Sequence, residues 1–317
     1  MEKIPEAEII SVADIIPERA AAVAEKTGAK AYSSMEELLN GEKPDVIHLC
    51  TPHYLHVPMA VDALNRGIHV LTEKPCAMTW KQLTVLQNAQ RRSNAQLGVC
   101  FQNRYNRSTE YLLEVIQSGE HGSLTGIRAV ITWCRDADYY SSGDWRGTQS
   151  QEGGGVLINQ AIHTLDLMDL LGGGISAVTA HTSNDHLQGV IEVEDTVSVL
   201  AEFRSGIRGV FYATNANAVT SPVMLELNFT KKTLRLEGDC VYEIGDGSIA
   251  PVLDSHSGET VGKTCWGNSH GLLICDFYDC IKNGRRFKLD AFEGGRAVEL
   301  VSRIYESAAS GKRLGIG

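Results

Sequence analysis

A lysine at the end of a predicted buried strand is the first candidate for chemistry. Apolar residues at 68–71 predict the strand, and Glu73-Lys74-Pro75 follows it directly. Pro75 fixes its own φ and favours an extended Lys74. Open α/β sheets bind ligands at such strand ends, so an ammonium held there would polarise a hydroxyl or carbonyl, or exchange a proton with it. The alternative is that Glu73 and Lys74 are ordinary solvated residues.

A histidine that follows three glycines is the second candidate. Residues 153–155 are all glycine, and the pattern after them predicts a helix over 156–171. The glycines would let the backbone approach a ligand closely, with a helix N-terminus pointing at it. Asn159 and His163 are four residues apart and would project from one helix face into a cleft. An imidazole suits proton exchange near neutral pH, although a lone helical histidine can also be purely structural.

The elements that must position these side chains alternate between strand and helix. Strands are predicted near 7–14, 46–50, 68–72 and 96–101, and helices near 17–28, 34–41, 55–66 and 79–92. This alternation predicts a doubly wound, Rossmann-type parallel sheet. We expect it to form a dinucleotide-binding domain over residues 1–121.

An aspartate at the end of the first predicted strand indicates a nucleotide ligand. Asp14 occupies the position where an acid binds the adenosine ribose, and Ile15 follows where an arginine would bind a 2′-phosphate. This favours NAD over NADP, and a helix-capping role is compatible with it. The glycine-rich phosphate loop should lie about 20 residues before this acid. Only thirteen residues precede Asp14, so the first strand and its glycines are expected to be absent from this sequence.

The second half is dominated by strands. Alternation over 197–203 and 207–213 flanks a Ser205-Gly206 turn, and strands over 223–230 and 233–237 follow. Consecutive hairpins predict a large, mostly antiparallel open sheet within an α/β domain over residues 122–317. Helices are predicted over 268–283, beginning near His270, and over 292–310. Apolar residues on both sheet faces indicate burial against a second copy, as a homodimer or homotetramer.

Composition restricts the class of protein. The 317 residues carry a formal net charge of −10, which argues against nucleic acid or an anionic membrane as partner. The apolar runs are shorter than a membrane span. Eight cysteines, Cys265 among them, form no CxxC pair, and Cys275 and Cys280 do not share a helix face. We therefore expect buried thiols, a cytoplasmic location and no metal site.

Taken together, these motifs resemble the Gfo/Idh/MocA family of oxidoreductases. The resemblance runs along nearly the whole chain, and the motifs are specific in their order and spacing. They are Asp14 with 17–20, Cys50-Thr51-Pro52 with His56, Glu73-Lys74-Pro75, Gln102-Asn103-Arg104-Tyr105, Trp145-Arg146-Gly147, the glycines at 153–155 through His163 and Asp166, and a closing segment at 308–312.

The resemblance implies hydride transfer between NAD and a secondary alcohol of a sugar, cyclitol or related compound. Lys74 and His163 would flank the reacting oxygen, and which of them is the base stays open. The family often has aspartate where this chain has Asn159. The implied cofactor-binding residues are Asp14, Thr51, Pro52, His56, Glu73, Lys74, Gln102, Trp145 and Arg146. The implied substrate-binding residues are Lys74, Tyr105, Asn159, His163 and His270.

Two other functions are compatible with the same residues. In the first, a glycoside-modifying enzyme holds NAD tightly as a redox shuttle within one catalytic cycle. In the second, a family member without its glycine-rich loop folds but does not catalyse a reaction.

Around residues 136–148, an aromatic and polar loop suits a nicotinamide and sugar site, or else is a surface loop with a buried tryptophan.

Overall fold

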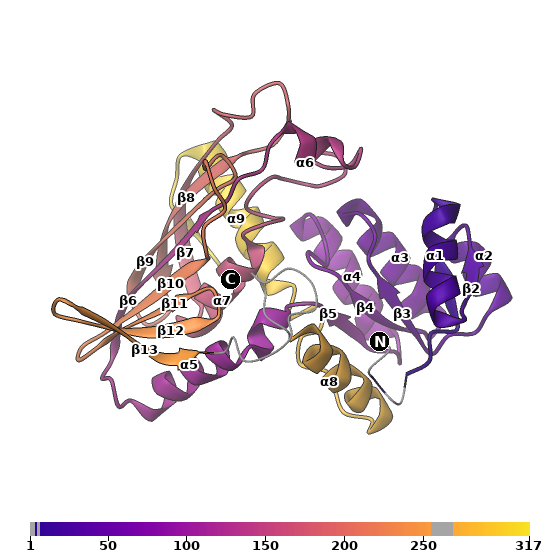
Figure 1. Ribbon diagram of the computed structural model, residues 1–317, viewed down its shortest axis with the longest axis horizontal. Helices are drawn as coiled ribbons and strands as arrows, with labels where there is room; N and C mark the ends of the chain where they lie inside the picture. Colours follow the sequence, from indigo (N-terminus) through magenta and orange to yellow (C-terminus); the bar gives the residue numbers. More distant parts are fainter. Residues whose placement is uncertain (1–3, 5–6, 255–268) are drawn as a thin grey trace.

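The computed structural model describes residues 4, 7–254 and 269–317. Short parallel strands with their helices form one end of the molecule, and a large sheet forms the other (Figure 1). Cys265 and the predicted helix start at Asn268 lie outside the described residues. The domain boundary between residues 121 and 122 stays a prediction.

The first part contains the predicted alternation of strands and helices. Its strands are β1 (Ser11–Ala13), β2 (Lys30–Tyr32), β3 (Val46–Leu49), β4 (His69–Thr72) and β5 (Leu97–Val99). Its helices are α1 (Pro17–Thr27), α2 (Met35–Gly41), α3 (His53–Asn65) and α4 (Trp80–Arg92). All the strand pairings in this part are parallel, as predicted.

These strands form two sheets, not one. β1 pairs with β2, whereas β3, β4 and β5 pair in that order. Among the described residues, no hydrogen-bonded pairing joins β1 to β3.

Local signals set the helix ends in this part. Pro17 stands in the first turn of α1, and Gly28 ends that helix at a φ of 74°. The Ser34 hydroxyl accepts the Glu37 N–H at 3.1 Å and so caps α2. Helix α3 begins at His53, two residues earlier than predicted, with Pro52 as its N-cap residue.

A 3₁₀ turn, η1 (Gln102–Tyr105), and helix α5 (Arg107–Ser118) lead to the second part, a nine-stranded sheet. Its strands are β6 (Leu124–Thr132), β7 (Ile175–Ser183), β8 (Thr196–Phe203), β9 (Arg208–Thr214), β10 (Met224–Phe229), β11 (Thr233–Glu237), β12 (Cys240–Gly245), β13 (Ser248–Asp254) and β14 (Leu314–Gly315). The order is β13-β12-β11-β10-β6-β9-β8-β7-β14. Only the β6–β9 pairing within this sheet is parallel. The prediction of a mostly antiparallel open sheet is therefore confirmed.

Alternation along β8 and β9 separates a buried face from an outer face. Val197, Val199 and Phe211 are buried, whereas Leu200 and Val210, which are register partners, are 62% and 48% exposed. Two helices pack against this part, α7 (Ile162–Leu171) against β6 and α9 (Arg296–Ser310) against β7. Helix α8 (His270–Lys282) packs on η1.

The helix predicted over 156–171 begins later than expected. Helix α7 starts at Ile162, and the residues before it form turns, so the prediction for this segment was wrong. The Val156 N–H donates to the Glu194 carbonyl, and the Ala161 N–H bonds back to the Val156 carbonyl in a wide turn. The hydrogen bond of this segment to residue 194 thus helps to set its path, in place of the helix that its local pattern predicts. Asn159 and His163 consequently do not share a helix face.

Two further boundaries differ from prediction. The loop predicted over 136–148 contains a short helix, α6 (Ala137–Ser141), which Asp136 caps by accepting the Tyr139 N–H at 3.0 Å. Helix α9 begins at Arg296, not at 292, because a turn around Asp290 precedes it.

A buried ion pair fastens α7 to η1. The Arg104 guanidinium donates two hydrogen bonds to the Asp166 carboxylate, at 2.7 and 2.6 Å, and a third to Glu293 at 2.6 Å. The side chains of Arg104 and Asp166 are only 10% and 2% exposed. Helix α7 is therefore held against the end of the parallel sheet.

We predict that Arg104→Ala lowers the free energy of unfolding by about 3–5 kcal/mol, because it leaves a buried carboxylate without its partner. Arg107→Ala is the matched control. Arg107 pairs with Glu110 and Glu114 while half exposed, so its loss should cost at most about 1 kcal/mol. Urea unfolding measures both, and equal losses would contradict the assigned role of Arg104.

Candidate active site

Lys74 reaches across from the parallel sheet to the turn that precedes α7. It lies two residues beyond the end of β4. Its Nζ donates to the Asn159 carbonyl at 3.0 Å and to the Asn159 side-chain oxygen at 3.2 Å. The two contacts hold the ammonium between the two parts of the molecule.

The Asn159 amide is itself held by a buried glutamate. Its Nδ2 donates to one carboxylate oxygen of Glu152, and the other oxygen accepts the Gly147 backbone N–H. Burial raises the pKa of Glu152 to about 7, although the hydrogen bonds from Gly147 and Asn159 oppose that shift. Sequence reasoning missed Glu152. The available signal was an acid directly before the glycine triplet.

His163 lies within the core beneath this contact. Only 4% of the residue is exposed, and its ring meets the ring of Phe101 edge-on at 5.6 Å. Burial lowers the pKa of His163 well below its usual value, and the charge of Lys74 and the neighbouring His270 lower it further. The imidazole is therefore neutral at pH 7.

The aromatic loop lies against a histidine that sequence reasoning did not single out. The ring of His53 lies 5.0 Å from that of Trp145, and its Nδ1 donates to the Glu152 carbonyl at 2.8 Å. The Arg146 guanidinium lies 4.6 Å from the Trp145 ring and donates to the Tyr139 hydroxyl at 2.8 Å. The predicted cofactor residues Trp145 and Arg146 are thus linked to Lys74, because Glu152 contacts both His53 and Asn159.

His56, another predicted cofactor residue, joins two loops. Its ring nitrogens each lie 2.7 Å from a carbonyl oxygen, one of Thr51 after β3 and one of Pro75 after β4. Burial lowers the pKa of His56, and a neutral ring can donate to only one carbonyl at a time. Its contacts fix the strand-end loops on which the predicted residues Thr51, Pro52 and Glu73 lie.

The glycine triplet does not serve the purpose predicted from sequence. A side chain at Gly153 would collide with Met78, one at Gly154 with the Tyr305 hydroxyl, and one at Gly155 with the Glu194 backbone. The chain's own atoms therefore fill the space beside all three glycines. The predicted helix N-terminus is also absent there, because α7 begins seven residues after the triplet.

Three more predicted residues lie near η1. The Tyr105 hydroxyl donates to Asp276 of α8 at 2.7 Å, and burial together with this carboxylate raises the pKa of Tyr105. Ser269 donates to the Tyr105 carbonyl at 3.1 Å, which places His270 beside it at the start of α8. Gln102 is 1% exposed, and its side-chain oxygen has no hydrogen-bond partner among the described residues.

Asp14 stands apart from this group. Its carboxylate accepts the Ile16 N–H at 2.8 Å. Ile16 itself is the N-cap of α1 and no described side chain caps that helix, so the capping role considered for Asp14 is not formed. It follows β1, whose partner β2 lies at the end of the molecule away from α7 (Figure 1).

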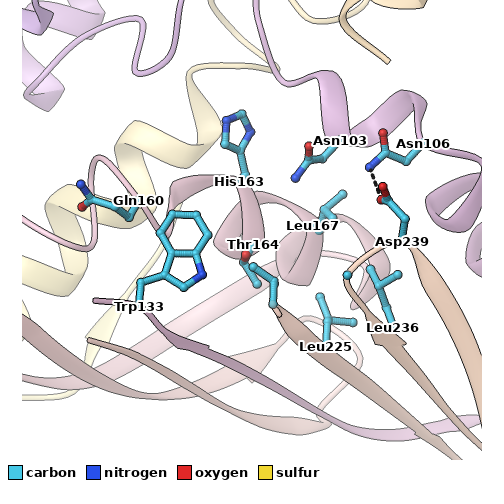
Figure 2. A pocket seen from close by; sticks show the side chains of 12 residues that line it. Asn103, Asn106, Trp133, Gln160, His163, Thr164, Leu167, Leu225, Leu236 and Asp239 are labelled. Carbon is cyan, nitrogen blue, oxygen red and sulfur yellow. Dashed lines mark hydrogen bonds between the residues drawn. The ribbon is translucent and has the colours of Figure 1, made fainter. Parts of the chain in front are cut away.

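A pocket opens beside His163. Its free volume is about 20 Å³, roughly the room that one water molecule needs. Figure 2 shows His163 between Trp133 and Gln160 on one side and Asn103 and Asn106 on the other. The side-chain oxygens of Asn103 and Asn106 have no hydrogen-bond partner among the described residues. Leu225 and Leu236 of the sheet contribute an apolar wall.

The described residues contain neither a metal-binding cluster nor a membrane-spanning helix. No group of three or more histidines, cysteines or acids is placed to hold a metal ion within this part of the chain. None of the helices described is long and apolar enough to cross a membrane.

Two family descriptions match the chain. Residues 1–101 match the NAD-binding Rossmann fold of the GFO/IDH/MocA oxidoreductases, and residues 109–235 match the GFO/IDH/MocA C-terminal domain. The chain belongs to the GFO/IDH/MocA family. The predicted family, the two-part α/β fold and the NAD-dependent oxidoreductase class are confirmed.

Similar proteins span nearly the same length. The D-glucoside 3-dehydrogenase of Escherichia coli K12 is 26% identical, over 97% of this chain and 90% of that protein. Levoglucosan dehydrogenase of Pseudarthrobacter phenanthrenivorans is 26% identical, over 94% and 87%. The WlbA dehydrogenase of Chromobacterium violaceum, solved with NADH and UDP-GlcNAcA, is 29% identical with a TM-score of 0.86, over 98% and 89%.

The residues at the strand ends fit a nicotinamide cofactor. The buried, unsatisfied oxygen of Gln102 suits an amide donor such as the carboxamide of nicotinamide. Thr51 and Pro52 follow β3, at the edge of the parallel sheet where such folds bind nucleotides. The ring of Trp145 lies 5.0 Å from that of His53, the residue after Pro52.

The raised pKa of Glu152 predicts a pH-dependent stability. Its folded pKa of about 7 exceeds the value of about 4.3 for an unfolded glutamate. The folded chain therefore holds a proton that the unfolded chain releases, and the stability contributed by this proton is lost as pH rises from about 4.3 through 7. Between pH 5.5 and 8, the stability of wild type relative to Glu152→Gln should fall by roughly 2 kcal/mol. Urea unfolding at both pH values measures this difference, and a constant difference would show that Glu152 is not titrating in this range.

Proposed function

We propose that this chain transfers a hydride between NAD and a secondary alcohol carbon of a sugar or a related polyhydroxylated ring. The observation that carries the proposal is the arrangement of Lys74 and His163. An ammonium and a neutral imidazole from different parts of the chain lie close enough for the charge of one to lower the pKa of the other. Such a pair can bind one substrate oxygen from two sides.

The two side chains would divide the work at that oxygen. NAD, when bound, would supply the hydride acceptor for the alcohol carbon. The neutral His163 accepts the hydroxyl proton as the carbon–oxygen double bond forms. Lys74 keeps its charge near the oxygen and stabilises the negative charge that develops there, and Asn159 holds the ammonium in place.

The side chains beside His163 are of the kinds that a polyhydroxylated substrate would contact. Asn103 and Asn106 offer side-chain oxygens with no partner among the described residues, and sugar hydroxyls are donors that would satisfy them. An apolar wall opposite polar groups suits the two kinds of surface of a sugar ring. The similar proteins named for D-glucosides and levoglucosan agree with this class.

Turnover is the direct test of the proposed function. The chain is incubated with NAD⁺ and methyl glucoside, levoglucosan or a cyclitol, and NADH is followed by absorbance. Formation of NADH together with a keto-sugar supports the proposal. Absence of both with every polyol, in a chain shown to bind NAD, would overturn it.

We predict that Lys74→Ala and His163→Ala each lower kcat by about 10²–10⁴-fold, the usual contribution of a positioned proton-transfer or electrostatic group. The Kd for NADH should change by less than about threefold, since the other predicted cofactor-binding residues stay in place. Stopped-flow turnover and fluorescence titration measure the two quantities. A variant with the turnover of wild type would remove that residue from the mechanism.

We also propose that the chain forms a homodimer or homotetramer through the outer face of the large sheet. Leu200 and Val210 are adjacent and exposed on that face. A contiguous apolar patch of this kind commonly marks an interface between protein chains.

Sedimentation of wild type at micromolar concentration should give a dimer or a larger species. Leu200→Glu with Val210→Glu should shift it toward monomer, because buried charges oppose association. Val85→Glu on α4, where Val85 is also 48% exposed, is the matched control and should leave the assembly unchanged. A monomeric wild type would contradict this proposal.

A cytoplasmic location remains part of the proposal. Cys50, Cys76 and Cys100 are free cysteines around the ends of the parallel strands, as is usual in a reducing compartment. Fractionation of the cells that produce the chain tests this location, and recovery from an oxidising compartment would contradict it.

A further inference from the structure

We propose that Glu152 is a positioning residue for Lys74, which acts by fixing the orientation of the Asn159 amide. This inference rests on the proposed function, because it concerns the placement of the ammonium used there. Glu152 lies outside every site residue predicted from the sequence.

The orientation of an asparagine side chain decides whether it can hold an ammonium. Its oxygen accepts hydrogen bonds and its NH₂ group donates them, so only one of its two orientations suits a lysine. Here Nδ2 donates to Glu152 and Oδ1 accepts from Lys74 at 3.2 Å. If the amide turned over, it would place donors against Lys74 and an acceptor against the carboxylate. Glu152 therefore selects the orientation that Lys74 requires.

The same carboxylate also fixes the aromatic loop. The second carboxylate oxygen accepts the N–H of Gly147, directly after Trp145 and Arg146. The backbone carbonyl of Glu152 accepts the Nδ1–H of His53. Glu152 is only 1% exposed, so water does not compete for these bonds. The position of the ammonium and the position of the loop thus depend on one side chain.

A glutamine at this position cannot reproduce both bonds to the protein. Two N–H donors face the carboxylate, one from Gly147 and one from Asn159. A carboxamide has one oxygen, so one of the two donors would meet an NH₂ group. Glu152→Gln keeps nearly the same shape and still removes an interaction.

Exchange of the two functional groups restores every bond. In the double variant Glu152→Gln with Asn159→Asp, the new amide can accept from Gly147 and donate to the new carboxylate. That carboxylate still has an oxygen for Lys74. Asn159→Asp alone would instead place two carboxylates face to face, which like charges disfavour.

The experiment compares kcat, the Kd for NADH and the melting temperature across these variants. Glu152→Gln should lower kcat by about tenfold to a hundredfold, the loss expected for a hydrogen bond to a charged group. Its Kd for NADH should stay within about threefold of wild type, because the ammonium acts in turnover more than in cofactor binding. The double variant should recover kcat to within about threefold of wild type, since its bonds are again complementary.

Glu192→Gln is the matched control. Glu192 is an exposed carboxylate near the same loop, where it accepts the Gln149 N–H, and its change should leave kcat unaltered. If Glu152→Gln does not fold, the comparison becomes that of Asn159→Asp with the double variant, which should have the higher kcat.

Two results would overturn the inference. One is a Glu152→Gln variant with the kcat of wild type, and the other is a double variant no faster than the slower single variant. Lys74→Ala separates this failure from failure of the proposed function. If Lys74→Ala loses turnover while the Glu152 variants do not, only the positioning role fails; if Lys74→Ala turns over normally, the proposed function fails.

Discussion

The contact between the Lys74 ammonium and Asn159 is the constraint on which the active-site arrangement depends. It joins a loop at the end of a parallel strand to a turn at the edge of the second part of the chain. Neither residue lies within a helix or a strand. The relative position of the two candidate catalytic side chains is therefore set by a few long-range hydrogen bonds.

Buried carboxylates make those bonds rigid. Glu152 holds the Asn159 amide, Glu194 accepts the N–H groups of Gly155 and Leu157, and Asp166 pairs with Arg104. A charge inside a protein is stable only when its surroundings satisfy it, so each carboxylate dictates the path of the backbone around it. In consequence the buried acids, more than the local sequence pattern, decide the path of the backbone in the turn before α7.

The difference between local sequence signals and long-range contacts explains what the sequence could and could not predict. Helix α1 and strands β8 and β9 follow from local signals, a proline, a glycine and strict alternation, and they occur where predicted. The start of α7 and the role of the glycines were predicted wrongly, because contacts with Met78, Glu194 and Tyr305, all distant in the sequence, decide them. Glu152 was missed for the same reason. Lys74 and His163 stand in local motifs that single them out in the sequence, whereas their proximity follows from the fold.

A crystal structure of the chain with NAD⁺ and an unreactive analogue of its substrate would test the central claim most directly. The account predicts that the Lys74 ammonium and the His163 ring both lie within hydrogen-bonding distance of one substrate oxygen, whose carbon faces C4 of the nicotinamide. Lys74 should at the same time keep its bond to Asn159. An oxygen bound by neither side chain, or a lysine turned away from the crevice, would contradict it.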